Sequence, residues 1–125
     1  MWIYARSGAA ALLLSQTGRF FTPGGSQVGW LEGESVYTTQ ADQIGWFGGG
    51  LLRDQDGNVC GFAPDPADPT HPALPVPIVH SGVLSLPAAA RRPSFPDPWV
   101  RAVARAEWSR LEPAELFDVP HTISR

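Results

Sequence analysis

Apolar and polar positions in the first half of the chain recur with a spacing of sixteen residues. The sequence Val28-Gly29-Trp30 returns as Ile44-Gly45-Trp46 and again as Cys60-Gly61-Phe62. Recurrence at a fixed spacing indicates that one supersecondary unit is used several times. The repeat therefore predicts the architecture before any single element is assigned.

A weaker first copy of the unit lies upstream. In this copy Tyr4 takes the position of Phe20, and Leu12 takes the position of Val28. Four copies then occupy about residues 2–63.

Each unit predicts two short strands separated by turns. In the last unit, Arg53 and Cys60 lie symmetrically about Asp56-Gly57, a pair that suits a two-residue hairpin turn. Gly33 and Gly49 separate successive units, and glycine readily adopts the positive φ that such turns require. Four units give eight strands, enough to close a meander and protect its edges. We expect a mainly β fold: a four-repeat antiparallel meander of eight short strands, closed or nearly closed.

Pairing across these turns divides the strand residues between two faces, because directly opposed residues share a face. One face carries Phe21, Val28, Trp30, Tyr37, Ile44, Trp46, Cys60 and Phe62, interrupted by Arg53. The other carries Phe20, Leu31, Val36, Phe47 and Leu52, with Gly29, Gly45 and Gly61 between them. Both faces are apolar, whereas a solvated face would be polar. We expect closure to bury one face and another segment to cover part of the second, where the glycines admit a close backbone approach.

The composition changes after Phe62, since ten of the 13 prolines lie in residues 64–98. We divide the chain into a β-repeat domain (1–63), a Pro-rich linker (64–96), a helical tail (97–118) and a disordered end (119–125). Asp97 and Pro98 suit a helix start, and an apolar spacing predicts a helix to Leu111. Pro113 suits the start of a second short turn. We expect the helix to pack on the repeat domain of its own chain or of a swapped partner.

Charge and hydropathy restrict the function classes. The formal net charge is −3 and all nine basic residues are Arg, a balance that disfavours nucleic acid as a partner. No segment approaches the ~20 apolar residues of a membrane span. The apolar stretch at 9–14 is shorter than the ~7–15 residues of a signal-peptide core, and it aligns with the repeat, so it predicts a strand. We expect a cytoplasmic location.

No catalytic, cofactor or metal constellation stands out. Cys60 is the single cysteine, and its repeat equivalents are apolar, so we expect a small buried hydrophobe. The stretch 54–58 resembles the start of a calcium loop, but its glycine comes fourth instead of sixth. The histidines lie at no metal-ligand spacing: His71, His80 and His121.

The motifs resemble those of the bacterial 4-fold beta flower proteins. The Val/Ile-Gly-Trp repeats and the stretch 53–62 carry the resemblance, and Trp108-Ser109 with Leu116-Phe117 is similar to the ending of that family's tail. The departures are the degenerate first repeat and a tail that is rich in Pro alone. The resemblance implies the four-repeat β fold and brings no catalytic residue with it.

We expect a non-enzymatic protein-binding or assembly module that needs no cofactor and binds an unknown protein partner or itself. The alternative is a small enzyme or ligand-binding protein with a pocket on the aromatic sheet face. The aromatic residues expected in the core or in an interaction surface are Trp30, Tyr37, Trp46, Phe62, Trp99, Trp108 and Phe117.

Overall fold

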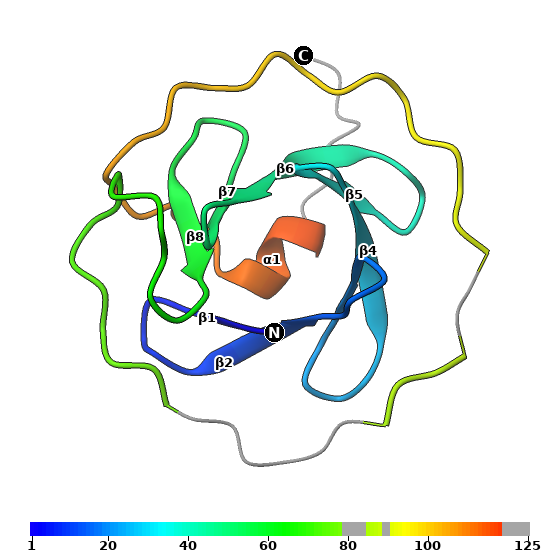
Figure 1. Cartoon of the computed structure of the whole chain (residues 1–125), viewed down its shortest axis with the longest axis horizontal. Coiled ribbons are helices and arrows are strands. Elements are labelled where there is room, and N and C mark those ends of the chain that lie inside the picture. The colour runs from blue at the N-terminus through cyan, green and yellow to red at the C-terminus, as the bar shows by residue number, and fades with distance from the viewer. Residues whose placement is uncertain (79–84, 89–90, 119–125) are drawn as a thin grey trace.

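The computed structural model describes residues 1–78, 85–88 and 91–118, which form a closed β-barrel with one short helix (Figure 1). Each strand pairs antiparallel with the next, and the first pairs with the last through Tyr4 and Phe62. The strands are β1 (Trp2–Tyr4), β2 (Ala10–Leu14), β3 (Arg19–Phe21), β4 (Gln27–Glu32), β5 (Ser35–Thr38), β6 (Gln43–Gly48), β7 (Leu51–Arg53) and β8 (Val59–Phe62). The predicted closed meander of eight strands is confirmed.

The turn inside each repeat is longer than the two-residue turn predicted from the sequence. In the last repeat the Asp54 N–H donates to the Asn58 carbonyl (2.9 Å) and the Gly57 N–H donates to the Asp54 carbonyl (3.1 Å). Gly57 has a φ of +85°, as its place in a tight turn predicts. The residues at the same place in the other turns also have positive φ: Gly8, Gly25 and Ala41.

This longer turn is accompanied by a β-bulge that changes the predicted faces. Arg53 pairs with Val59 and not with Cys60, so Cys60 is the extra residue of β8. Residues beside a bulge are re-aimed, since two residues then oppose one. Cys60 and Ile44 therefore lie in the interior cluster and Val28 packs against it, whereas the sequence placed all three on the same face as the tryptophans.

The first repeat lies one residue earlier in the chain than the sixteen-residue spacing predicts. Ile3 pairs with Leu12 inside the barrel just as Phe20 pairs with Gly29, so the spacing between these copies is seventeen residues. The connection between β2 and β3 has four residues (15–18), whereas the connection between β4 and β5 has two (33–34). Tyr4 consequently takes the outward position of Phe21, not the inward position of Phe20.

The helix α1 (Pro113–Asp118) lies within the ring of strands and fills its interior (Figure 1). Leu116 is fully buried there, and Phe117 is 9% exposed. A Cβ atom added to Gly29 would come within 2.4 Å of the Phe117 ring, so the absent side chain of this glycine makes room for the helix. The short turn predicted to start at Pro113 is confirmed as α1, and it is α1 that approaches the inward glycines.

We name residues 63–112 the belt. Its described parts run around the outside of the barrel before the chain enters the interior as α1 (Figure 1). The described parts of the belt contain no helix, so the predicted helix from Asp97 to Leu111 is wrong. A helix turns by about 100° per residue, which would point Trp99 and Trp108 to opposite sides. The extended belt lets both rings face the barrel, and this burial outweighs the local helical pattern.

The predicted disordered end, 119–125, lies outside the described residues. Within the part of the chain that the structure describes, no helix is long and apolar enough to cross a membrane.

We predict that Gly57→Val destabilises the protein by about 2 kcal/mol or more, because a β-branched residue is strained at positive φ. A Cβ atom at this position would also lie 2.2 Å from the belt carbonyl of Val103. Gly24→Ala is the matched control, since the nearest atom to its Cβ would be 3.8 Å away. Thermal denaturation measures both variants, and equal melting temperatures would contradict the turn geometry.

Candidate functional site

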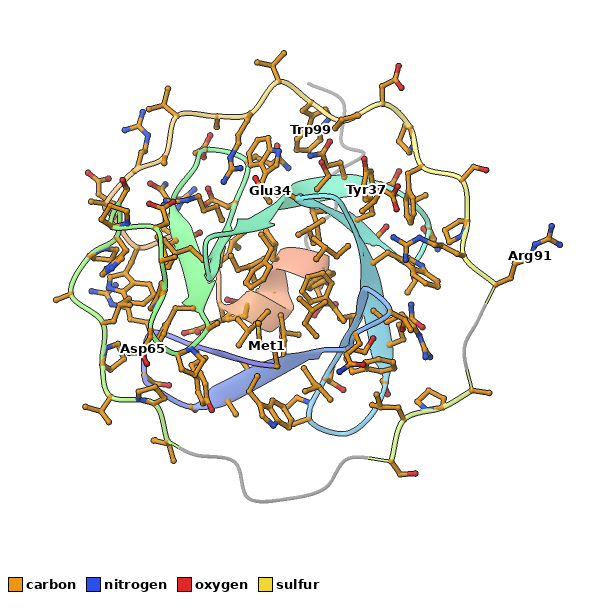
Figure 2. The ribbon with its side chains drawn as sticks, in the orientation of Figure 1. Met1, Glu34, Tyr37, Asp65, Arg91 and Trp99 are labelled. Carbon is orange, nitrogen blue, oxygen red and sulfur yellow. The ribbon has the colours of Figure 1, made fainter. Side chains whose placement is uncertain are left out.

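A band of aromatic side chains on the outer face of the barrel is covered by aromatic side chains of the belt. Figure 2 shows Tyr37 and Trp99 in this layer between the barrel and the belt. Three of the contacts, with their ring-centroid separations, are Phe95–Tyr37 (4.5 Å), Trp99–Trp46 (6.0 Å) and Trp108–Phe62 (6.4 Å). Tilted and edge-on ring contacts of this kind add to the free energy gained from burial alone. The belt thus covers the face that carries the tryptophans. The sequence predicted an added segment on the face with the glycines, and that face lies inside the barrel.

The seven aromatic residues singled out in the sequence do not form one site. Four barrel residues are at most 4% exposed: Trp30, Tyr37, Trp46 and Phe62. In the belt, Trp108 is half-buried and Trp99 is 40% exposed. Phe117 lies in the interior and contacts Phe20, with 5.4 Å between the ring centroids. The aromatic residues are therefore divided between a layer under the belt and the core of the barrel.

Arg53 joins the two ends of the belt to the barrel, an arrangement we name the clasp. Its guanidinium donates to the carbonyls of Gly57 (2.8 Å), Arg105 (2.9 Å) and Thr70 (2.6 Å), and to Asp68 Oδ2 (3.2 Å). Asp68 and Thr70 open the belt, whereas Arg105 lies near its end. The side chain of Arg53 is 1% exposed, so these bonds form in a dehydrated setting where they are strong.

The charge state of Asp68 supports the clasp. The Thr70 N–H donates to its carboxylate (2.8 Å) and, with the neighbouring Arg53, holds the pKa of Asp68 below its ordinary value. The carboxylate is therefore ionised at neutral pH and balances the buried guanidinium. From the sequence Arg53 was only an interruption of an apolar face, because the residues that meet it are 15 and 52 positions away.

Two further arginines of the belt contact the barrel at exposed positions. Arg92 pairs with Glu32 (2.7 Å) and lies over the Trp30 ring at 5.2 Å. Arg101 pairs with Glu34. Exposed pairs like these contribute little free energy, about 0–1 kcal/mol each, but they fix the path of the belt.

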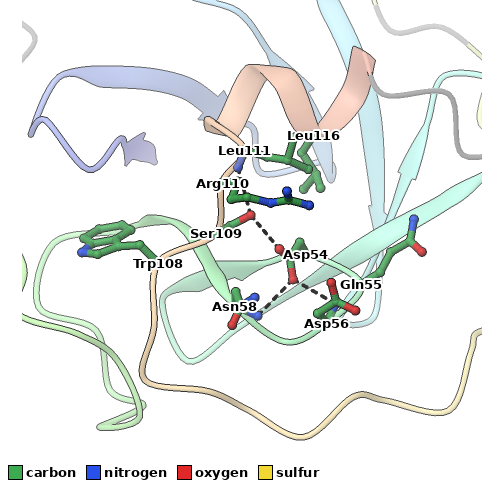
Figure 3. A pocket seen from close by; sticks show the side chains of 9 residues that line it. All are labelled: Asp54, Gln55, Asp56, Asn58, Trp108, Ser109, Arg110, Leu111 and Leu116. Atoms are coloured by element: carbon green, nitrogen blue, oxygen red, sulfur yellow. Dashed lines mark hydrogen bonds between the residues drawn. The ribbon is translucent and has the colours of Figure 1, made fainter.

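A cavity of about 390 Å³ lies where the belt turns inward to become α1 (Figure 3). Asp54 stands at its centre and accepts three hydrogen bonds, from the N–H groups of Asp56 (2.9 Å) and Asn58 (3.0 Å) and from the Ser109 hydroxyl (2.6 Å). The cavity is lined by Asp54, Gln55, Asp56, Asn58, Trp108, Ser109, Arg110, Leu111 and Leu116. The polar groups at its centre thus serve the turn and the end of the belt.

The resemblance of residues 54–58 to a calcium loop has a structural cause. Oδ1 of Asp54 accepts backbone N–H groups two and four residues ahead, which closes the turn with a side chain. The acidic and amide residues at this spacing therefore belong to a hairpin turn that the Asp54 side chain stabilises. Among the described residues, no group of three or more His, Cys, Asp or Glu side chains could hold a metal ion.

Cys60 lies inside the barrel and is 2% exposed. Burial raises the pKa of its thiol to about 12, despite a hydrogen bond with Ser109 that acts in the opposite direction. A thiol of this kind is protonated at neutral pH, and the thiolate is the nucleophilic form. Its position fits the small buried hydrophobe predicted from its apolar repeat equivalents.

Exposed apolar side chains lie at two places on the belt, at Val76 and Ile78 and again at 99–103, and the second stretch is the one that the sequence predicted as a helix. Val100 is 97% exposed and Val103 is 81% exposed, although their spacing placed both on the buried side of a helix. One feature of the sequence argues against the predicted helix: in a helix, Trp99 and Trp108 would point to opposite sides. We name residues 97–105 the belt face.

These features define a class of protein: a four-repeat β-barrel that is encircled by its own Pro-rich belt and filled by its own C-terminal helix. A family model for the 4-fold beta flower protein matches residues 1–117, and the chain belongs to this family. The suggested resemblance is therefore confirmed over nearly the whole chain. No curated protein and no solved structure matches the chain.

We predict that Arg53→Met lowers the free energy of unfolding by about 3 kcal/mol, because the carbonyls of Thr70 and Arg105 lose this donor and Asp68 loses its cation. Trypsin should also cleave faster after Arg105, whose carbonyl the clasp holds. Arg92→Met removes an exposed pair and should cost at most about 1 kcal/mol. Chemical denaturation and limited proteolysis measure these effects, and equal losses in the two variants would refute the clasp.

A second prediction concerns alkaline pH. The pKa of Cys60 is raised to about 12 in the folded protein, so between pH ~9 and ~12 the unfolded state releases a proton that the folded state retains. The contribution of this thiol to stability is complete below the unfolded pKa and is lost as the pH rises through the folded pKa, by up to roughly 1.4 kcal/mol per pH unit. Cys60→Val should abolish this component of the loss. Urea denaturation of both proteins at several pH values tests it, and parallel stability curves would contradict it.

Proposed function

We propose that this protein is a non-enzymatic protein-binding module that recognises its partner through the belt face. The observation that carries the proposal is the near-complete exposure of Val100 on a backbone that is held on both sides. Scattered single apolar residues on a surface are ordinary, but clustered ones mark interaction sites. Val100, Val103 and the 40%-exposed Trp99 lie within five residues of one another.

The belt face is anchored at both ends, which favours binding. The Trp99 N–H donates to Gln43 Oε1 (2.8 Å), and the Arg105 N–H donates to the Gly57 carbonyl (3.1 Å). A segment held in this way loses little conformational entropy when a partner docks on it. The two valines therefore present apolar surface at a low entropic cost.

A cleft beside the belt face supplies room for partner side chains. It has a volume of about 470 Å³ and is lined by Gln55, Asp56, Asn58, Ala102, Val103 and Arg105. Apolar and charged groups are thus adjacent, as in interfaces that combine an apolar centre with a polar rim.

The non-enzymatic part of the proposal is supported by the environments of Cys60 and Asp54. The pKa of Cys60 is raised to about 12 by burial, and all three bonds of Asp54 hold the turn and the belt. The cytoplasmic location expected from the sequence stays a prediction.

The proposal is tested by affinity capture with the tagged full chain in a lysate to which the untagged chain has been added. A protein retained by the natural sequence should be lost with Val100→Glu, because a buried unpaired carboxylate disfavours the complex. Val76→Glu is the matched control, since Val76 is 86% exposed on a distant part of the belt. The proposal fails if every retained protein, the untagged copy included, is bound equally by both variants.

A further inference from the structure

The cavity at the point where the belt turns inward combines charged and apolar groups from three parts of the fold. Asp54 and Asp56 come from the turn between β7 and β8, whereas Arg110 comes from the end of the belt (Figure 3). The apolar part of the lining consists of Trp108, Leu111 and Leu116. A volume of about 390 Å³ lies in the range of small-molecule sites, which are apolar with a few polar groups.

The opposite charges at this cavity are not paired with one another. Arg110 and Asp56 are both exposed, and neither takes part in an ion pair among the described residues. Asp54 differs from them, because its carboxylate already accepts three hydrogen bonds. Within the described chain, the cavity therefore offers one unpaired cation and one unpaired anion beside an apolar wall.

We propose that this cavity binds a free α-amino acid with an apolar side chain. Such a molecule carries an ammonium and a carboxylate on one carbon, so a single ligand provides a partner for Asp56 and a partner for Arg110. Hydrogen bonds between ionised groups are stronger than those between neutral groups. The apolar side chain of the ligand packs on Trp108 and the two leucines, where its burial adds to the affinity.

The mixed charge of the lining distinguishes this ligand from singly charged ones. A monocarboxylate binds Arg110 but brings a second anion close to Asp56, and a monoamine binds Asp56 but brings a second cation close to Arg110. Like charges at a binding surface reject a ligand. A zwitterion satisfies both side chains, and a residue within a peptide chain has neither charged group.

The inference goes beyond the proposed function, because the cavity shares no lining residue with the belt face. Val100→Glu should therefore bind amino acids as the natural chain does. Loss of partner capture with retained amino-acid binding removes only the protein-binding proposal, and the reverse result removes only this inference.

The test begins with isothermal titration calorimetry of the full chain with L-phenylalanine and L-leucine. Two analogues keep the phenyl body and one charge each: 3-phenylpropionate lacks the ammonium, and 2-phenylethylamine lacks the carboxylate. Each analogue should bind about tenfold or more weakly than L-phenylalanine, because one ionic contact is lost.

Two variants then assign each charge of the ligand to its side chain. Arg110→Met should weaken binding of L-phenylalanine about tenfold or more and leave 2-phenylethylamine within about threefold of its natural affinity. Asp56→Asn should weaken L-phenylalanine similarly and leave 3-phenylpropionate at least as tightly bound. The turn should persist in this variant, since Asp56 bonds to Asp54 through its backbone N–H.

The matched controls are Arg91→Met and Asp97→Asn, because both side chains are exposed on the belt and neither lines the cavity. Circular dichroism checks that every variant is folded. Nuclear magnetic resonance locates the ligand: of the five tryptophan indole signals, the one absent from Trp108→Phe should shift on titration.

Three results overturn the inference. The first is that neither amino acid binds at concentrations up to about 10 mM, a limit that covers weak sites. The second is that both variants bind L-phenylalanine as tightly as the controls do. The third is a titration in which the Trp108 signal does not move.

Discussion

The buried guanidinium of Arg53 is the interaction on which the closed shape of this molecule depends. The belt leaves the barrel after β8, passes around it and returns to the same repeat, where one side chain binds both its beginning and its end. A long loop has many open conformations, so holding its two ends at one point removes most of them. Removal of the guanidinium would take this donor from the carbonyls of Thr70 and Arg105 and would also release the two ends of the loop. The position that carries an aromatic ring in the other repeats therefore carries an arginine here.

The need for a belt follows from the sheet itself. Both faces of the strands are apolar, and closing the barrel buries only one of them. Proline lacks a backbone donor and restricts its own φ, so a Pro-rich segment can lie across aromatic rings without competing for the strand hydrogen bonds. Its unfolded form also has fewer conformations to lose, which lowers the entropic cost of ordering the described parts of the belt, which have little secondary structure of their own. The Pro-rich composition after Phe62 and the aromatic outer face therefore belong together, because the Pro-rich segment covers that face.

Much of the barrel could be predicted from the sequence, because its information is local and repeated. The sixteen-residue spacing, the turn glycines and the apolar strands all recur, and each copy supports the others. The bulge beside Cys60 could not be predicted, since a three-residue turn and a two-residue turn fit the same glycine. The belt was misassigned for a different reason: residues 97–111 have a helical pattern, and only the positions of Trp46 and Phe62 in space decide that Trp99 and Trp108 pack as they do. The clasp likewise could not be predicted, because its residues lie far apart in the sequence.

The belt also makes the sides of a nearly symmetrical barrel different from one another. The outward positions of Trp30, Trp46 and Phe62 are equivalent in the repeat, yet the belt covers them with different partners: Phe95 and Arg92, then Trp99, then Trp108. A barrel with four similar sides offers no unique surface, whereas a belt that passes each side with a different sequence does. The aromatic residues of the strands contact the belt, so its outer side remains exposed. Under the proposed function, specificity would reside in the belt, the least regular segment of the chain, and the repeats would hold that segment in place.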